Sequence, residues 1–244
     1  MRIVVLSDAH SNTEALTAVF RHAEAAGAVD AVWSLGDMVG YGPEPAQAMA
    51  MLRERPLTPV AGNHDLAAAA GIGVDEFNSF AAHAALWSGD QLSEAERQWL
   101  LELPETRIAG EFTLAHGTLR DPVWEYLLSA EQALVQFELQ TTRYSLVGHS
   151  HLPLWFEEVP GAMPRLRIAG DGQRVPLGET RLILNPGSVG QPRDGDPRAS
   201  YLLYDDGAAM ATWHRIEYDI ASTQAKMRAV HLPQWLSERL SIGK

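Results

Sequence analysis

The chain has 244 residues, of which 46% are hydrophobic and 20% are charged, with no cysteine and a formal net charge of −12. A chain of this length buries about 70–75% of its unfolded surface on folding, enough for a core without cross-links, and the absence of cysteine excludes disulfides and thiolate chemistry. The acidic balance and the lack of a Lys/Arg-rich segment disfavour a nucleic-acid partner, because phosphate contacts need clustered basic side chains.

The first 65 residues alternate between predicted strands and helices. Arg2–Leu6 is a short β-branched apolar run, as expected for a buried strand. Ser11–Glu14, with the sequence SNTE, has the pattern of a capping box and predicts a helix that ends near Ala26. Further strands are predicted over Asp30–Asp37 and Leu57–Val60, with a helix over Ala46–Arg53 between them. This alternation indicates a parallel sheet with crossover helices.

The central part of the chain differs in pattern from the beginning. Asp75–Pro104 predicts two helices that break near Gly89, the second capped by Ser93 with Glu96 three residues later. Two strands flank Gly110 and the second ends at His116, a helix covers about Ser129–Leu139, β patterns dominate from Arg143 onward, and the last 25 residues predict a closing helical segment. We see no repeat and no linker. The prediction is a single domain over 1–244 with a helical insertion at about 75–104.

Targeting and membrane signals are missing from this pattern. The apolar run before Ser7 is shorter than a signal peptide requires. No apolar stretch approaches the ~18 residues of a membrane span. We therefore expect a cytoplasmic protein that does not enter a membrane.

Polar side chains gather directly after the predicted strands. They are Asp8-x-His10, Gly36-Asp37, Gly62-Asn63-His64-Asp65, His116-Gly117 and Gly148-His149-Ser150-His151. Ligands of open α/β sheets bind at the carboxyl ends of the strands, so these groups are candidates for one common site. Oxygen and nitrogen donors without sulfur suit divalent Mn, Fe, Zn, Co or Ni.

The order and spacing of these motifs resemble the calcineurin-like metallophosphoesterases. The segment Asn185–Tyr201, NPGSVGQPRDGDPRASY, is similar to the small prokaryotic phosphodiesterase-like branch of that family. The resemblance implies an α/β fold, a four-layer α/β/β/α sandwich of two mixed sheets flanked by helices. It also implies hydrolysis of a small phosphate ester by attack of a hydroxide that bridges two divalent metal ions.

The resemblance also implies a role for each motif residue. One metal site would consist of Asp8, His10, Asp37 and His151, and the other of Asp37, Asn63, His116 and His149. His64 would stabilise the phosphoryl oxygens or protonate the leaving group, and Asp65 would orient His64. Two divalent ions carry four positive charges against the two negative charges of the carboxylates, so the site would attract phosphate despite the acidic chain.

Other polar residues are more ambiguous. Arg193 and Arg198 belong either to a charged turn rich in Gly, Pro and Asp or to a phosphate-binding group, since the planar guanidinium suits phosphate oxygens. His83, on the helical insertion, is a weaker candidate for the cleft. The remaining histidines, expected at the surface or the edge of the core, are His22, His214 and His231.

One motif departs from that of the serine/threonine phosphatases in the same superfamily. Their pattern is Gly-Asp-x-x-Asp-Arg-Gly, whereas this chain has Gly40 in place of the second Asp and Tyr41 in place of the Arg. The departure favours a phosphodiester substrate. The alternatives are a protein or nucleotide phosphomonoesterase and a non-catalytic scaffold of the same fold. The presence of His64 and of all seven ligand positions disfavours the scaffold, and oligomeric state is not predicted.

Overall fold

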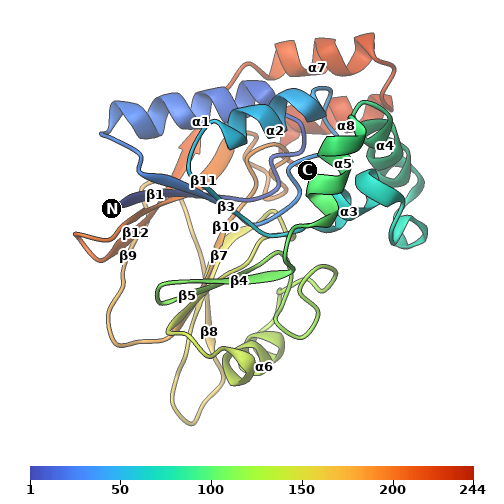
Figure 1. Cartoon of the computed structure of the whole chain (residues 1–244). Coiled ribbons are helices and arrows are strands. Elements are labelled where there is room, and N and C mark those ends of the chain that lie inside the picture. The colour runs from blue at the N-terminus through green and yellow to red at the C-terminus, as the bar shows by residue number, and fades with distance from the viewer.

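The computed structural model describes all residues 1–244 and contains two six-stranded sheets packed face to face between helices (Figure 1). The strand order is β3-β2-β1-β11-β12-β9 in the first sheet and β4-β5-β6-β10-β7-β8 in the second. Both sheets are mixed, since each contains three consecutive parallel strands with antiparallel neighbours. The predicted four-layer α/β/β/α sandwich is confirmed.

The first sheet is built from the N-terminal alternation and from the end of the chain. Its strands are β1 (Arg2–Leu6), β2 (Ala31–Ser34), β3 (Leu57–Pro59), β9 (Arg174–Pro176), β11 (Ala199–Asp205) and β12 (Met210–Ile216). Helices α1 (Thr13–Ala25), α2 (Pro45–Arg53) and α7 (Ile220–Ala229) lie on the same outer side (Figure 1). The capping box expected at Ser11 is wrong: the N-cap is Asn12, whose side chain accepts a hydrogen bond from the backbone of Ala15.

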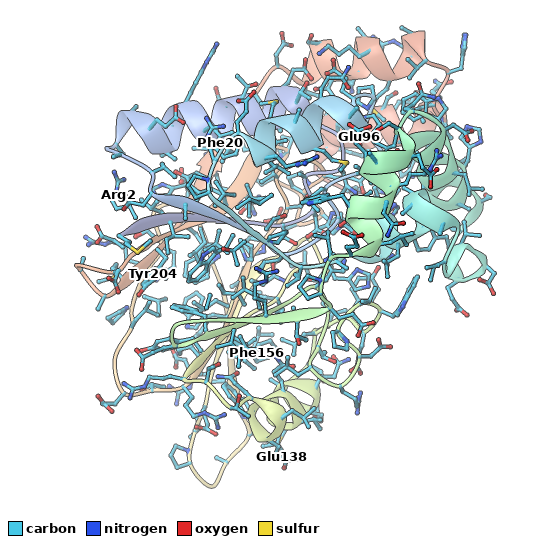
Figure 2. All side chains as sticks on the ribbon, in the orientation of Figure 1. Arg2, Phe20, Glu96, Glu138, Phe156 and Tyr204 are labelled. Atoms are coloured by element: carbon cyan, nitrogen blue, oxygen red, sulfur yellow. The ribbon has the colours of Figure 1, made fainter.

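The second sheet follows in the middle of the chain. Its strands are β4 (Thr106–Ala109), β5 (Phe112–Ala115), β6 (Tyr144–Leu146), β7 (Pro153–Glu157), β8 (Arg165–Ile168) and β10 (Leu182–Pro186). Helix α6 (Ala130–Leu139) packs on it through Phe137 against Phe156 and Ile183. Figure 2 shows Phe156 inside this layer and Phe20 beneath α1, at opposite ends of the sandwich.

The first sheet packs against an apolar layer on each of its two faces. Between the sheets, alternating residues such as Val5, Leu114 and Trp213 form one core. On the other face of β1, Val4 and Leu6 pack with α1 and α2. Because side chains of a strand alternate between its faces, β1 is buried on both sides and reads as a continuous apolar run.

The remaining helices lie at the strand ends. They are α3 (Asn63–Ala70), a 3-10 turn (Val74–Glu76), α4 (Ser79–Asp90), α5 (Glu94–Leu101), α8 (Gln234–Glu238) and a final 3-10 turn (Arg239–Ile242). The predicted cap of α5 by Ser93 and Glu96 is confirmed. Helix α3, which begins at Asn63, was not among the predicted helices. None of the helices has both the length and the apolar character that crossing a bilayer requires.

Candidate metal centre

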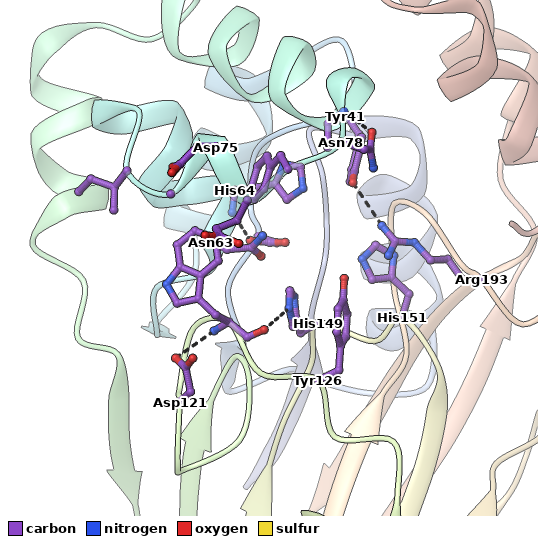
Figure 3. Close-up of a pocket in the computed structure, with 17 residues that line it drawn as sticks. Tyr41, Asn63, His64, Asp75, Asn78, Asp121, Tyr126, His149, His151 and Arg193 are labelled. Atoms are coloured by element: carbon purple, nitrogen blue, oxygen red, sulfur yellow. Dashed lines mark hydrogen bonds between the residues drawn. The ribbon is translucent and has the colours of Figure 1, made fainter.

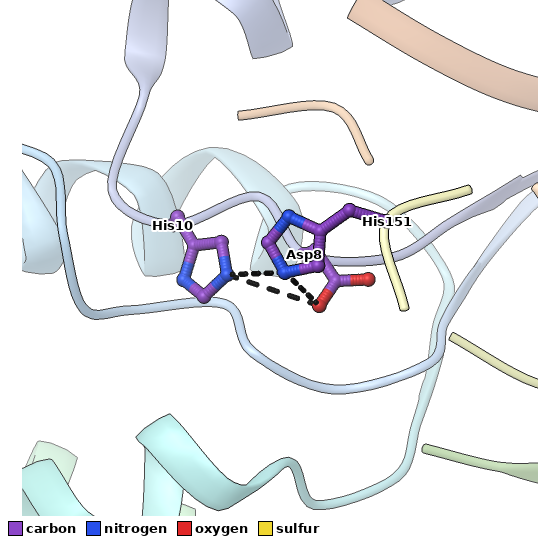
Figure 4. A group of neighbouring side chains, drawn as sticks. All are labelled: Asp8, His10 and His151. Carbon is purple, nitrogen blue, oxygen red and sulfur yellow. Dashed lines mark hydrogen bonds and ion pairs between the residues drawn. The ribbon is translucent and has the colours of Figure 1, made fainter. Parts of the chain in front are cut away.

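Seven predicted ligands converge where the parallel strands of both sheets end. Asp8 and His10 follow β1, Asp37 follows β2 and Asn63 begins α3 after β3. The second sheet supplies His116 after β5, and His149 and His151 after β6. All seven side chains are buried. Three groups have donor atoms close enough for one ion each. Asp8–His10–His151 (Figure 4) and Asp37–His116–His149 share no residue, and the third, His10–Asp37–His64, overlaps both.

The backbone at these positions is unusual. Asp8, His10, Asp37, His149 and His151 all have φ between 45° and 64°. Non-glycine residues rarely occupy this left-handed region, and such strain persists where the surrounding structure holds it in place for a function. The segment Asn185–Tyr201 contributes to that support, since Ser188 Oγ donates to the Asp8 carbonyl at 2.9 Å.

Hydrogen bonds fix the ring orientation of each histidine that is predicted to be a ligand. The partners are backbone carbonyls: Val39 for His10 Nδ1 (3.0 Å), Leu35 for His116 Nδ1 (2.7 Å), Trp124 for His149 Nε2 (3.1 Å) and Gln191 for His151 Nδ1 (2.5 Å). A carbonyl only accepts, so the bonded nitrogen carries a proton and the other nitrogen of a neutral ring presents its lone pair. This arrangement is typical of histidines that bind metals.

The first donor group fits a cation. His10 Nε2 and His151 Nε2 face each other at 3.3 Å, and Asp8 Oδ1 lies 3.1 Å from His151 Nε2. Asp8 Oδ1 is buried and accepts no hydrogen bond. Lone pairs directed at one point in a buried site repel one another, and a cation at that point removes the repulsion and satisfies all three atoms.

Asp37 lies between the two donor groups. Its Oδ2 is 3.7 Å from His10 Nε2 and 3.4 Å from His116 Nε2. Asn63 Oδ1 is 3.1 Å from the same nitrogen of His116, so it faces the second group. The other Asp37 oxygen accepts the backbone N–H of His64 at 2.8 Å.

The electrostatics of the site favour binding of positive charge. Burial lowers the pKa of His10 and His151, and lowers the pKa of His149 to about 3, so these rings are neutral. Burial by itself would raise the pKa values of Asp8 and Asp37, yet neighbouring histidines, among them the positively charged His116, hold both pKa values below normal. Both carboxylates are therefore ionised at neutral pH.

The protonation state of His116 predicts how metal binding depends on pH. Burial alone would lower its pKa, but the Asp37 carboxylate raises the pKa to about 9. A proton therefore occupies His116 below that pH and must leave before the ring binds a cation. We expect the affinity for Mn²⁺ to rise with pH by about tenfold per unit between pH 6 and 8. Calorimetric titration of metal-stripped protein measures this slope, and an affinity that does not change with pH would contradict it.

His64 and Arg193 line a cavity of about 680 Å³ that also reaches Asp37, Asn63, His149 and His151 (Figure 3). Arg193 is the only lysine or arginine among its 17 lining residues. Arg198 lies outside the cavity, and its guanidinium binds Asp196 at 2.7 Å and Asp171 at 3.3 Å. Two nearby carboxylates bind Arg198, which disfavours a contact with substrate, so that role stays a prediction.

Asp65 also differs from expectation. It is fully buried, and its oxygens accept the backbone N–H groups of Val39 (3.2 Å) and Gly62 (3.1 Å). The ring of His64 is not among its hydrogen-bond partners, so Asp65 does not orient it by direct contact. Instead, Asp65 caps the N-terminus of α3 and thereby places His64, in the first turn of that helix.

The cavity has aromatic walls that the sequence did not indicate. They are Tyr41, Phe77, Trp124 and Tyr126. The ring of Tyr126 stacks on His149 with centroids 3.9 Å apart and planes inclined by 7°. Of the helical insertion only the beginning, up to Ala81, reaches the cavity. The other histidines lie outside the cavity: His22, His83, His214 and His231.

A two-sheet sandwich with buried carboxylates and imidazoles at its strand ends defines the metallophosphoesterase class. The family model of the calcineurin-like phosphoesterase superfamily domain matches residues 1–207. The chain belongs to this superfamily of metal-dependent enzymes that hydrolyse phosphate esters, and the resemblance seen in the sequence is confirmed.

Individual relatives agree with this assignment. An uncharacterized protein of Methanocaldococcus jannaschii is 34% identical over 99% of this chain and 98% of its own length. The crystal structure of a metallophosphoesterase from Sphaerobacter thermophilus superimposes with a TM-score of 0.90 at 43% identity, covering 100% of this chain and 99% of that one. A hypothetical protein of Pyrococcus horikoshii shares the fold with a TM-score of 0.81 at 17% identity, over 100% and 98% of the two chains.

Proposed function

We propose that this protein is a phosphodiesterase that uses two divalent metal ions. The observation that carries the proposal is the position of Asp37, whose Oδ2 faces His10 of one donor group and His116 of the other. One carboxylate between two groups of ligands is the arrangement by which two-metal hydrolases hold both ions. We also propose that residues 1–244 form a single domain. The cytoplasmic location stays a prediction.

The proposed ligand sets follow the geometry of the two groups. The first set comprises Asp8, His10, Asp37 and His151, and the second comprises Asp37, Asn63, His116 and His149. When bound, the ions would supply Lewis acidity to the phosphate and lower the pKa of a water molecule between them. The donor atoms suit Mn, Fe, Zn, Co or Ni.

The other side chains would bind and orient the substrate. Arg193 reaches into the cavity from the side opposite Asp75 and Asp121 (Figure 3) and is positioned to bind a phosphate oxygen. Hydrolysis joins a water oxygen to phosphorus and breaks the P–O ester bond, with one proton of the water ending on the released alcohol. Burial lowers the pKa of His64 to about 4, so the ring is neutral at pH 7. It would act as a hydrogen-bond donor to an oxygen that gains charge in this step.

The charges that line the cavity support a diester. Besides Arg193, the lining includes the carboxylates of Asp75, Glu76 and Asp121. A phosphomonoester carries close to two negative charges at neutral pH and a diester carries one. One arginine and, besides the proposed ligand Asp37, three carboxylates in the same cavity therefore disfavour the monoester.

A matched pair of chromogenic substrates tests the proposal. Metal-stripped protein is assayed with bis(4-nitrophenyl) phosphate and 4-nitrophenyl phosphate, before and after addition of Mn²⁺. We expect no turnover without metal, and faster turnover of the diester once metal is bound. Faster turnover of the monoester would instead identify a phosphomonoesterase. If neither ester is hydrolysed by protein shown to hold two ions, the non-catalytic scaffold becomes the better interpretation.

A further inference from the structure

His64 lacks the polar partner that usually fixes a catalytic histidine. The side chain is 4% exposed, and its Nδ1 is buried without a hydrogen-bond partner. The four ligand histidines, in contrast, each have one nitrogen bound to a backbone carbonyl. A histidine that acts on substrate needs a defined ring plane, so something other than a hydrogen bond at Nδ1 must supply it.

The chain around His64 leaves no place for a carboxylate at Nδ1. Gly40 is the residue in contact with this side of the ring, and a Cβ atom there would lie 2.4 Å from Nδ1. Its φ of +89° is, in addition, strained for any side chain. The nearest buried acid along the chain, Asp65, uses both oxygens on backbone N–H groups.

Aromatic rings surround the imidazole instead. The ring of Tyr41 lies 4.3 Å from that of His64 at an angle of 47°, and the ring of Phe77 lies 4.6 Å away at 34°. His10 meets His64 edge-on at 4.9 Å. Figure 3 shows Tyr41 and His64 along the same side of the cavity. Aromatic pairs at these separations prefer defined relative orientations, so they restrict rotation of the ring.

We propose that Tyr41 and Phe77 are positioning residues for His64, holding its ring plane by aromatic contact where a carboxylate would otherwise hold it by a hydrogen bond. This inference rests on the proposed function, in which His64 contacts the substrate. Because Nδ1 faces Gly40, the proposed role requires the proton of the neutral ring to be on Nε2. Phe77 precedes α4, so the helical insertion would contribute to catalysis by fixing this donor as well as by forming a wall of the cavity.

Phe77 offers a cleaner test than Tyr41. Its ring neighbours are His64 and Trp124, whereas Tyr41 also contacts the proposed ligand His10 and the guanidinium of Arg193. Phe77→Leu keeps an apolar side chain of similar size but removes the aromatic ring. Phe77→Tyr keeps the aromatic ring. Phe80→Leu makes the same change at a half-exposed position on α4 and serves as the control.

Two readouts separate positioning from a loss of structure. With bis(4-nitrophenyl) phosphate and Mn²⁺, we expect Phe77→Leu to lower kcat by about tenfold to hundredfold with KM and metal content unchanged, and Phe77→Tyr to recover most of the loss. In zinc-loaded protein, the ring protons of His64 should show an upfield ring-current shift in the NMR spectrum that Phe77→Leu reduces and Phe80→Leu leaves in place.

The outcomes distinguish this inference from the proposed function. An unchanged His64 spectrum in Phe77→Leu overturns the inference, whatever the activity is. So does an equal loss of kcat in the Phe80→Leu control, or a loss that Phe77→Tyr does not restore. Absence of turnover in the metal-loaded parent protein would refute the proposed function, and the NMR comparison would still decide whether the two aromatic rings hold His64.

Discussion

Replacement of Asp37 by asparagine should abolish turnover of a phosphodiester, with a loss of at least about a thousandfold because both ions depend on this carboxylate. An amide is neutral and has only one oxygen. If that oxygen keeps the hydrogen bond from His64 N–H, now 2.8 Å long, no oxygen remains to face His10 and His116. The variant is nearly isosteric, so we expect the fold to be retained while the number of bound ions falls from two to one or none.

Metal content after dialysis and the rate with bis(4-nitrophenyl) phosphate measure the two parts of this prediction. Asp90→Asn, at an exposed position where α4 ends, makes the same chemical change away from the cavity and should leave both quantities unchanged. A thermal unfolding curve shows whether the variant is folded. Two bound ions together with parental activity in Asp37→Asn would refute a bridging role for Asp37.

The convergence of the proposed ligand residues could be predicted from the sequence because each follows a strand that has a strong local signal. Asp8 comes directly after the apolar run of β1, and His116 comes after the β5 run FTLA. The ends of parallel strands meet at one edge of a sheet, so the order of such motifs along the chain is enough to place them together. The alternation indicated a parallel sheet, and the two mixed sheets followed from the family resemblance.

The environment of these ligands could not be predicted, because it depends on packing between segments far apart in the chain. Phe77 contacts His64 only after α4 packs on α3, and Tyr126 reaches His149 from the loop between β5 and α6. Neither aromatic residue lies in a motif. Their positions are set by tertiary contacts, about which local patterns carry no information.

Two further differences from expectation have local causes. Asp196 is two residues from Arg198 and binds its guanidinium, which the turn sequence alone did not distinguish from a phosphate contact. The family resemblance led to the expectation that Asp65 orients His64. The alanine-rich run that follows it was a signal for a helix, and an acid at the third position of a helix commonly caps its N-terminus.

The second large effect concerns His64 itself. We expect His64→Ala to lower kcat for the diester by about 10²–10³, the usual loss when one donor to a developing negative charge is removed. Metal content should stay unchanged, since His64 belongs to neither proposed ligand set. His64→Gln keeps a side-chain N–H of comparable reach and should recover part of the rate.

The pH dependence of kcat decides between the two roles that were considered for His64. Burial lowers its pKa to about 4, with the charge of Asp37 opposing this only in part, and bound cations would lower it further. A ring that is neutral throughout pH 6–8 donates a hydrogen bond equally well across that range, so His64→Ala should reduce the rate by the same factor at every pH. A general acid would instead lose efficiency as its proton dissociates. The contrary result is that kcat of the parent protein decreases at alkaline pH and that His64→Ala removes this decrease. In that case His64 protonates the leaving group, and the hydrogen-bond role proposed above is wrong.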